Sequence, residues 1–250
     1  MNAVGDRARR TGPRALDVTV TRRYRAMWGV VRLLIRLLFD VRVTGAERWP
    51  AAPFQIVANH HNGFDPLIVI GALPLEPRIT WFGPREADFS HGFKNRLMAF
   101  FGGVIPYSPD GTTLTSAVRA VRRVFDAGGV LAIFAEGRIG FRETGLLPFE
   151  DGAAAFAVAA GVPVVPCAIV GTTQLWFRRR VDVRFGEPIA TTGIRGRAGR
   201  IELDGRIRSA IETMLPRAEP HVPRRRPLSF LTDVLNGPDD IARRNASERA

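Results

Sequence analysis

The residues most able to do chemistry form a short polar cluster between Asn59 and Asp65. In this cluster His60 stands five residues before Asp65. A histidine beside a carboxylate is the commonest arrangement for a general base, because the imidazole titrates near neutrality and the carboxylate fixes its tautomer. Gly63, between the two, permits the tight return that such a contact requires. The cluster is therefore a candidate catalytic dyad of His60 and Asp65.

Two other interpretations of this cluster stay open. An aspartate directly before a proline, as in Asp65-Pro66, is typical of a helix start, where it acts as the N-cap. The capping and dyad interpretations are compatible. A metal site that uses His60, His61 and Asp65 is a third interpretation, but adjacent histidines point apart in most backbones, and we expect no metal here.

A second polar cluster is Glu136-Gly137-Arg138. A glycine lets the backbone approach a ligand closely, and a guanidinium offers a planar fork of donors that suits phosphate. The plainer alternative is an ion pair in an exposed loop. The sequence has no nucleophile-elbow serine and no phosphate-binding GxxxxGK[ST] loop, so neither of those chemistries is indicated.

The elements that position these clusters alternate between strand and helix patterns, which predicts an α/β fold: a single domain with a largely parallel central sheet flanked by helices. The continuously apolar run 129–136 is expected to be central. Strands are predicted at 41–45, 54–59, 78–83, 103–107, 129–136, 162–171 and 181–186. Helices are predicted from Asp65-Pro66 and at 90–101, 113–126, 151–160 and 200–215.

The two polar clusters come directly after two of these strands, at 54–58 and 129–135. In open α/β sheets ligands gather at the carboxyl ends of the strands. If the two strands run parallel, His60, Asp65 and the 136–138 cluster share one edge of the sheet. This convergence depends on the element order alone.

The charge of the chain is strongly basic and unevenly distributed. Lys and Arg number 36 against 24 Asp and Glu, a net charge of +12, and residues 1–40 hold nine arginines and three aspartates, or +6. Such an excess indicates an anionic partner: nucleic acid, an anionic membrane surface or a phosphorylated substrate. Half of the excess therefore lies in the first sixth of the chain.

Within that region, residues 21–40 have the pattern of an amphipathic helix. On a helical wheel the arginines fall on one stripe of about 80°, and apolar residues cover most of the remainder. The stripe consists of Arg22, Arg25, Arg32 and Arg36. A wide apolar arc beside arginines favours a helix that lies in a membrane interface. The alternative is a helix packed on its own domain with a solvated arginine stripe.

Other features exclude several classes of protein. With 46% hydrophobic residues over 250 positions, the chain is neither collagen-like nor disordered. Its one cysteine, Cys167, lies in an apolar run and is expected to be a buried, inert thiol. No run reaches the ~18 apolar residues that span a bilayer, and Thr21-Arg22-Arg23 is a poor match to an export signal.

The two motifs together resemble those of a known family. Asn59-His60-x4-Asp65 resembles the NHxxxxD motif of the glycerolipid acyltransferases of the lysophosphatidate acyltransferase type. Residues 134–140, FAEGRIG, resemble their FPEGTRS motif in its FPEGRIS variant. Residues 145–154 and the VPVVP segment at 162–166 are similar to the family's later segments, including its fourth motif. The resemblance runs from about residue 42 to 190, and two motifs in register are a specific signal.

The resemblance implies a 1-acylglycerol-3-phosphate O-acyltransferase-like enzyme of phospholipid biosynthesis. His60, supported by Asp65, would take the proton of a lysophospholipid hydroxyl, which attacks the thioester of acyl-CoA or acyl carrier protein. Glu136, Gly137 and Arg138 would help to hold the glycerol phosphate. No cofactor and no nucleic acid would be needed, apart from the acyl thioester as co-substrate. The enzyme would be peripheral on the cytoplasmic face of the cell membrane.

The resemblance also implies a division of the chain. Residues 1–20 would be a mobile basic arm, 21–40 the membrane-interface helix, 41–216 the acyltransferase domain, and 217–250 a polar tail with one short helix near 228–235.

The sequence departs from the family pattern at the second motif, where Ser108 stands in place of the arginine that binds the acceptor phosphate. Ala135 and Asn62 replace a proline and a serine elsewhere. The phosphate would then be bound through Arg138 or Arg85, or the acceptor would differ from lysophosphatidate.

Two alternatives to this enzyme are a basic membrane- or nucleic-acid-binding protein without activity and a catalytically silent lipid-binding relative. A nucleic-acid binder predicts arginines interleaved with aromatics on a sheet face, whereas the excess here lies on an amphipathic helix. The presence of both His60 and Asp65 argues against the silent relative.

Overall fold

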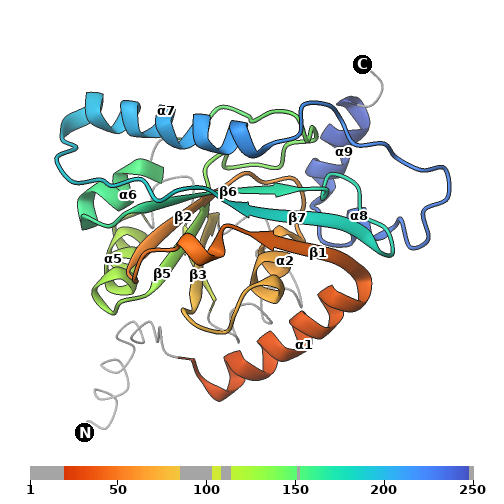
Figure 1. Ribbon diagram of the computed structural model, residues 1–250, viewed down its shortest axis with the longest axis horizontal. Coiled ribbons are helices and arrows are strands. Elements are labelled where there is room, and N and C mark those ends of the chain that lie inside the picture. Colours follow the sequence, from red (N-terminus) through yellow and green to blue (C-terminus); the bar gives the residue numbers. More distant parts are fainter. Residues whose placement is uncertain (1–19, 85–102, 108–113, 151–152, 248–250) are drawn as a thin grey trace, which may run out of the picture.

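The computed structural model describes residues 20–84, 103–107, 114–150 and 153–247. In this part of the chain seven strands form one sheet in the order β1-β7-β6-β2-β5-β3-β4 (Figure 1). All neighbours pair in parallel except β6 and β7, which are antiparallel. The strands are β1 (Phe39–Thr44), β2 (Phe54–Ala58), β3 (Ile79–Pro84), β4 (Val104–Tyr107), β5 (Val130–Phe134), β6 (Val164–Val170) and β7 (Arg179–Phe185). The predicted largely parallel α/β sheet is confirmed.

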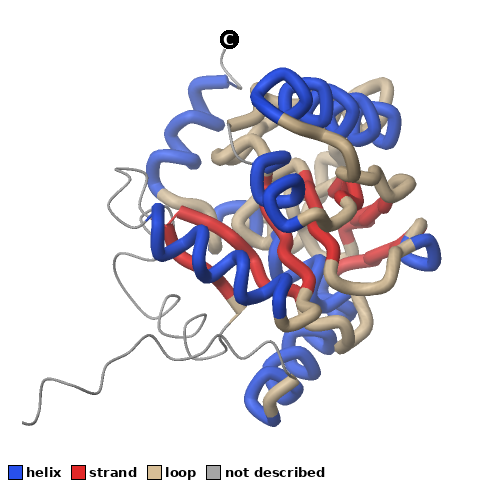
Figure 2. Tube along the Cα trace, turned by 90° about the vertical axis from the view of Figure 1, so that its left-hand side faces the viewer, coloured by secondary structure: helices blue, strands red, loops and turns tan. Residues whose placement is uncertain are grey.

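Helices cover both faces of this sheet, and Figure 2 shows the strands lying between them. They are α1 (Arg22–Leu38), α2 (Asp65–Ala72), α5 (Leu114–Asp126), α6 (Ala153–Ala160), α7 (Gly196–Met214), α8 (Leu231–Val234) and α9 (Pro238–Ser247), with a 3-10 turn η1 (Ala46–Arg48). The helix predicted at 90–101 and most of the predicted arm lie outside the described residues.

The core has two halves because successive side chains of a strand point to opposite faces. In β2, Ile56 and Ala58 pack into the half beneath α1 and α2, while Val57 packs into the half covered by α5, α6 and α7. All five residues of β2 are buried. A strand buried on both faces is largely apolar, as in β5, which has no polar residue, and in β2, whose one polar residue is Gln55.

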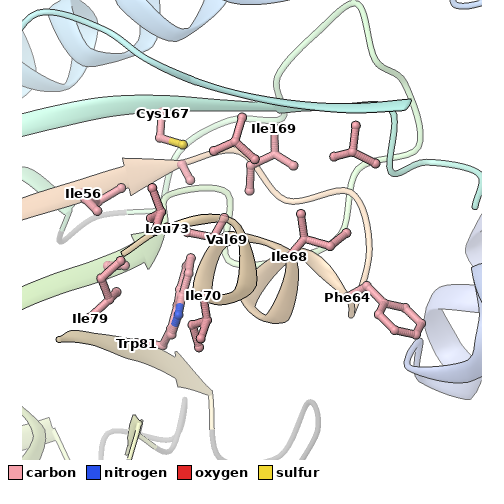
Figure 3. Close-up of a cluster of buried hydrophobic side chains, with 14 of the residues drawn as sticks. Ile56, Phe64, Ile68, Val69, Ile70, Leu73, Ile79, Trp81, Cys167 and Ile169 are labelled. Atoms are coloured by element: carbon pink, nitrogen blue, oxygen red, sulfur yellow. The ribbon is translucent and has the colours of Figure 1, made fainter. Parts of the chain in front are cut away.

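Helix α2 packs into one half of the core. Ile68, Val69 and Ile70 of this helix are packed among side chains from β2, β3 and β6 (Figure 3). Cys167 lies in the same cluster and is fully buried, which confirms the expectation of a buried thiol. Burial and the charge of Asp65 both raise the pKa of this thiol, so it stays protonated.

Helix α1 packs along α2 with one face and exposes another. The side chains of Tyr24, Met27 and Ile35 are buried. The exposed face carries four large apolar side chains with half or more of their surface exposed: Val30 59%, Leu33 59%, Leu34 50% and Leu37 56%. The packing of one face on the domain is thus observed, and the membrane contact of the other face stays a prediction.

Arg32 differs from the sequence expectation of an outward stripe. Its guanidinium donates to the carbonyl oxygens of Gly71 and Leu73, both at 3.1 Å, and lies over the ring of Trp28. These carbonyls end α2 and have no partner within that helix, so a cationic donor satisfies both their hydrogen bonding and the helix dipole. Arg32 thus ties α1 to α2. None of the helices in the described ranges is long and apolar enough to cross a membrane.

The segment from Arg217 onward holds more structure than the tail expected from sequence. It contains both α8 and α9, and Leu231 is buried in the core next to the sheet. Asp233 of α8 forms two hydrogen bonds with the guanidinium of Arg244 in α9, at 2.6 and 3.1 Å. Leu231 thus holds the segment against the domain, and the Asp233–Arg244 contact joins its two helices.

Candidate active site

The loops after β2 and β5 meet at one edge of the sheet, as their order in the sequence predicts. The parallel register pairs Ala58 with Phe134. Beyond these residues, the backbone N–H of His60 donates to Oε1 of Glu136 at 3.0 Å, and the backbone N–H of Gly140 donates to the carbonyl of His60 at 2.8 Å. The loop after β5 therefore clamps the main chain of His60 on both sides.

The carboxylate of Asp65 is the centre of the loop that carries His60. Its Oδ2 accepts the Nδ1–H of His60 at 2.9 Å, the backbone N–H of His61 at 2.7 Å and that of Asn62 at 2.9 Å. Asp65 is the first residue of α2, and these bonds go to residues before it, so its side chain organises the loop rather than capping the helix. Because the carboxylate accepts from Nδ1, the neutral His60 ring has its lone pair on Nε2.

Aromatic rings hold the His60 side chain in the same orientation. The imidazole stacks on Phe134, with ring centroids 3.9 Å apart and planes inclined by 9°. Phe134 stacks in turn on Trp81 at 4.7 Å. The His60 side chain keeps 16% of its surface exposed, whereas the Asp65 side chain is completely buried. One ring is thus fixed by a carboxylate and a ring face while remaining open to a reactant.

The neighbouring histidine points away, into the protein. The side chain of His61 has no exposed surface, and its Nδ1 lies 3.5 Å from Oε2 of Glu143, which is equally buried. Glu143 also accepts the backbone N–H groups of Gly171 and Thr173 and the hydroxyl of Thr173. His61 therefore connects the loop of residues 59–65, which we call the catalytic loop after its candidate dyad, to the turn between β6 and β7.

The pKa values of this pair shift in the directions expected of an ion pair. Burial lowers the pKa of His61, but the hydrogen bond to Glu143 and the charges of Glu143, Asp65 and Glu136 outweigh burial and raise it. Burial raises the pKa of Glu143, but its hydrogen bond and attraction to His61 dominate, with help from the Gly171 amide, and lower it to about 2. The two histidines and two carboxylates thus form separate pairs, and among the residues described no cluster of three His, Cys, Asp or Glu side chains could hold a metal ion.

Asn59 fixes the point at which the loop leaves the sheet. Its Oδ1 accepts the backbone N–H of Ile169 at 2.7 Å, and its Nδ2 donates to the carbonyl of the same residue at 2.9 Å. This amide side chain therefore continues the β2–β6 ladder by one step after the backbone of β2 has turned away. The position of His60 is set by this end of the ladder.

Glu136 lies at the site with its carboxylate turned toward the main chain. It is 1% exposed, and its Oε2 accepts the backbone N–H of Leu147 at 2.7 Å while Oε1 accepts that of His60. Burial raises the pKa of Glu136, an effect that the amides of Leu147 and His60 only partly offset. Both carboxylate oxygens thus serve to hold two loops together.

Gly137 and Arg138 are exposed beside this glutamate. Gly137 has a φ of 62°, and a Cβ there would lie 2.6 Å from the Cγ of Glu150, so the turn requires glycine. The structure therefore brings His60, Asp65 and Glu136 into contact, and Gly137 and Arg138 follow Glu136 in the same loop. Arg85 and Ser108 lie outside the described residues.

The sequence analysis missed contacts from the C-terminal segment. The backbone N–H of Gly63 donates to Oδ1 of Asn236 at 2.8 Å, and the side chain of Asn62 donates to the carbonyl of Thr232 at 2.9 Å. A Cβ at Gly63 would lie 2.3 Å from the carbonyl oxygen of Leu235. The catalytic loop is thus packed between the sheet and this segment.

Comparison with known proteins gives consistent results. The model of a family described as Acyltransferase matches residues 40–170, which contain both polar clusters. A probable 1-acyl-sn-glycerol-3-phosphate acyltransferase of Mycoplasma genitalium is 32% identical over 127 residues, covering 49% of this chain and 46% of the relative. The 1-acyl-sn-glycerol-3-phosphate acyltransferase of Saccharomyces cerevisiae is 26% identical over 182 residues, covering 68% and 57%. The chain thus spans about half the length of these curated relatives.

Among solved structures, the crystal structure of the 1-acyl-sn-glycerophosphate (LPA) acyltransferase PlsC from Thermotoga maritima has a similar fold. The TM-score is 0.60 at 20% sequence identity, and the match covers 76% of this chain and 79% of that one. This likeness supports the assigned fold independently of the motifs.

Proposed function

Because the chain belongs to the acyltransferase family, we propose that it transfers an acyl chain from a thioester to the free hydroxyl of a lysophospholipid such as 1-acylglycerol 3-phosphate. The observation that carries the proposal is the His60–Asp65 contact of 2.9 Å at a partly exposed sheet edge. A buried carboxylate with three donors cannot turn away from the ring, so the histidine is preorganised as a base.

In the proposed mechanism Nε2 of His60 takes the hydroxyl proton of the acceptor as its oxygen attacks the thioester carbonyl. Asp65 stabilises the imidazolium that forms. The tetrahedral intermediate then expels the thiolate, which receives the proton from Nε2 and leaves as the thiol. The products are the acylated phospholipid and the free thiol, and His60 returns to its neutral state. No acyl group is attached to the enzyme, and no cofactor is needed in this reaction.

For the acceptor phosphate we assign Arg138. This arginine is exposed and lies in the loop that carries Glu136. Guanidinium groups bind phosphate through two parallel hydrogen bonds, which a lysine cannot reproduce. Glu136 acts here on the position of His60, since its oxygens accept main-chain amides. Gly137 serves the turn between them.

A transfer assay tests the proposal. The purified protein is incubated with labelled acyl-CoA, or with labelled acyl carrier protein in a parallel series, together with 1-acylglycerol 3-phosphate. Transfer of label into diacylated product with either donor supports the function and identifies the donor. A second panel with lysophospholipids that lack a terminal phosphate monoester tests the acceptor. Absence of product with every donor and acceptor pair would refute the proposal.

We propose further that α1 docks the enzyme on the anionic cytoplasmic face of the cell membrane. Its exposed apolar strip, Val30, Leu33, Leu34 and Leu37, is bordered by exposed arginines. These are Arg22, Arg25 and Arg36. Apolar side chains beside guanidinium groups match the acyl boundary and the phosphates of a bilayer. A peripheral enzyme placed there meets an acceptor and a product that are themselves membrane lipids.

A variant of α1 tests the docking surface. Leu33→Ser with Leu37→Ser removes two exposed side chains without touching the buried face, so folding should be retained. Sedimentation with phosphatidylglycerol vesicles should show weaker binding than wild type, and binding should weaken further as salt rises. Equal binding of the variant and wild type would refute the role of α1.

A further inference from the structure

A second apolar surface lies on the C-terminal segment and the β6–β7 turn. It consists of Phe177, Leu228 and Phe230, which are 45%, 42% and 62% exposed, and we call it the Phe230 patch. The backbone N–H of Phe177 donates to the carbonyl of Pro227 at 2.8 Å, so the turn and the segment are in direct contact. Large exposed aromatic side chains that gather on one surface are typical of an interaction site.

The Phe230 patch adjoins the exposed face of α1. The backbone N–H of Arg178 donates to the carbonyl of Leu38 at 2.6 Å, and its guanidinium donates to the carbonyl of Arg36 at 3.2 Å. The end of α1, the β6–β7 turn and α8 lie at the same side of the molecule in Figure 1. The β6–β7 turn that carries Phe177 therefore lies against the C-terminal end of α1.

Arginines surround the patch. Four exposed arginines accompany it, which are Arg178, Arg224, Arg225 and Arg226. Between residues 217 and 230 the only acidic residue is Glu219. This combination of aromatic and aliphatic side chains with a cluster of guanidinium groups is complementary to an anionic lipid headgroup layer and the acyl boundary below it.

The backbone of the patch is strained in a way that solvent exposure alone does not explain. Within the described residues, the non-glycine residues with positive φ are Arg178, at 62°, and Leu228, at 60°. Such a conformation costs about 1 kcal/mol for a residue with a Cβ, and glycine or asparagine adopts it more easily. A leucine at this strained and exposed position indicates that its side chain has a contact to make.

The patch is also coupled to the catalytic loop. Thr232, two residues after Phe230, accepts the side-chain amide of Asn62 at its carbonyl, and its hydroxyl accepts the backbone N–H of Leu175 at 2.9 Å. The segment that carries the patch thus contacts the loop that contains His60 and Asp65. An acceptor lipid leaving that surface would travel only a short way to reach the base.

We propose that the Phe230 patch is a second membrane contact, which inserts Phe177, Leu228 and Phe230 into the interface of an anionic phospholipid bilayer beside α1. The proposal rests on the membrane docking proposed for α1 and extends it from one helix to a two-part footprint. The patch orients the opening of the site toward the lipid, whereas α1 alone would leave the molecule free to roll about the helix axis.

Residue labelling tests this footprint directly. Phe230→Cys is labelled with an environment-sensitive fluorophore, and Cys167 does not compete because it is fully buried. Ile201→Cys, at a position on α7 that is 61% exposed against 62% for Phe230, is the matched control. With phosphatidylglycerol vesicles the label at 230 should shift to shorter wavelength and the label at 201 should not. No shift at 230, or equal shifts at both positions, would overturn the proposal.

Binding measurements give a second, independent result. Leu228→Asn relieves the positive-φ strain, so it should preserve or raise Tm while weakening vesicle binding by about 10-fold, the effect of losing one buried aliphatic side chain. Arg225→Gln should weaken binding to phosphatidylglycerol vesicles but leave the weaker binding to phosphatidylcholine unchanged. Vesicle binding of Leu228→Asn equal to that of wild type would refute the membrane contact. Self-association of the wild-type protein without vesicles, if it is lost in Leu228→Asn, would also refute it, because the patch would then be a protein–protein interface.

Activity separates this proposal from the proposed reaction. With a short-chain, water-soluble lysophospholipid, Leu228→Asn should react at the wild-type rate, whereas with long-chain acceptor in vesicles its rate should fall with its binding. If wild type fails to react with any acceptor, the reaction is refuted, and the fluorescence shift still decides whether the patch meets the membrane.

Discussion

His60 and His61 are adjacent in the chain, and each faces a carboxylate, yet the two pairs have opposite surroundings. The His60 side chain is 16% exposed and its Nδ1 is 2.9 Å from Asp65. The His61 side chain is fully buried and its Nδ1 is 3.5 Å from Glu143. Each carboxylate also accepts backbone amides, from the catalytic loop in one pair and from the β6–β7 turn in the other.

The two pairs differ in access and not in residue type, and access is what separates the proposed reactive pair from the buried one. A buried ion pair is strongly held, because each charge would be left without a partner if the other were removed. A partly exposed ring can bind a hydroxyl and return its proton. The spacing of His60 and Asp65 predicts one of the two pairs, and the fold adds that His61 pairs with Glu143.

Among the variants that test this difference between the two pairs, His60→Ala is expected to have the largest effect, a loss of activity. Removing a general base typically lowers the rate by about 10²- to 10⁴-fold. The residue is partly exposed, so Tm should change little. The measurement is kcat in the transfer assay beside thermal unfolding, with Phe230→Ser as a matched surface control assayed on the short-chain acceptor. A His60→Ala enzyme with the wild-type kcat would contradict the assigned mechanism.

Glu143→Gln should produce the converse result. Removing one partner of a buried ion pair leaves an uncompensated charge and costs about 3 kcal/mol or more. Denaturant unfolding should therefore show a large loss of stability, and the double variant Glu143→Gln with His61→Gln should recover part of it, since neither side chain of this pair is then charged. Activity per folded molecule should fall far less than in His60→Ala. If Glu143→Gln were as stable as wild type, the His61–Glu143 pair would not stabilise the fold, contrary to the role assigned to it.

The contrast also explains how much of the site could be predicted from the sequence. The strands β2 and β5 and the clusters after them were predicted, because strands buried on both faces are largely apolar and the carboxyl ends of parallel strands share an edge. The contact of His60 with Asp65 was expected from their short separation along the chain. These are local patterns and simple topology.

The contacts that could not be predicted join distant residues. His61 with Glu143, and Gly63 with Asn236, join residues separated by about 80 and 170 positions, and no periodicity reports such contacts. Arg32 looked like one more member of an arginine stripe, because a helical wheel cannot show that α2 ends beside it. Helix α9 did have a local signal, Pro238 with Asp239 and Asp240 directly after it, which is typical of a first helical turn.

The pH dependence of stability is expected to reflect the buried pair. The pKa of Glu143 is about 2 in the folded protein and 4.5 as its ordinary value, so its contribution is complete above pH 4.5 and is lost as the pH falls toward 2. The pKa of His61 is raised, so its contribution is present below pH 6.5 and is lost as the pH rises through the folded value. The pKa of Glu136 is also raised, so this residue lowers the stability of the fold as the pH rises above 4.5. This effect is opposite in sign to that of Glu143, which acts below pH 4.5.

These signs lead to a measurable difference between variants. Wild type should lose about 1 to 2 kcal/mol between pH 4.5 and 3 from the titration of Glu143. The midpoint of denaturant unfolding, measured across this range, should fall more steeply in wild type than in Glu143→Gln. Parallel slopes in the two proteins would mean that another carboxylate controls acid stability.

The smallest expected effect concerns the support of the His60 loop from outside the domain core. Asn236→Ala removes the acceptor of the Gly63 amide, a hydrogen bond of about 1 kcal/mol, and so allows the loop that carries His60 to shift. We expect kcat to fall by about 3- to 10-fold with KM nearly unchanged, because Asn236 acts on the base and not on the acceptor. Asn236→Asp keeps an acceptor oxygen at the same position and should restore most of kcat. If Asn236 has only a structural role, Asn236→Ala should lower Tm, and kcat per folded molecule should stay unchanged in both variants. In that case Asp65 and Glu136 alone would position His60.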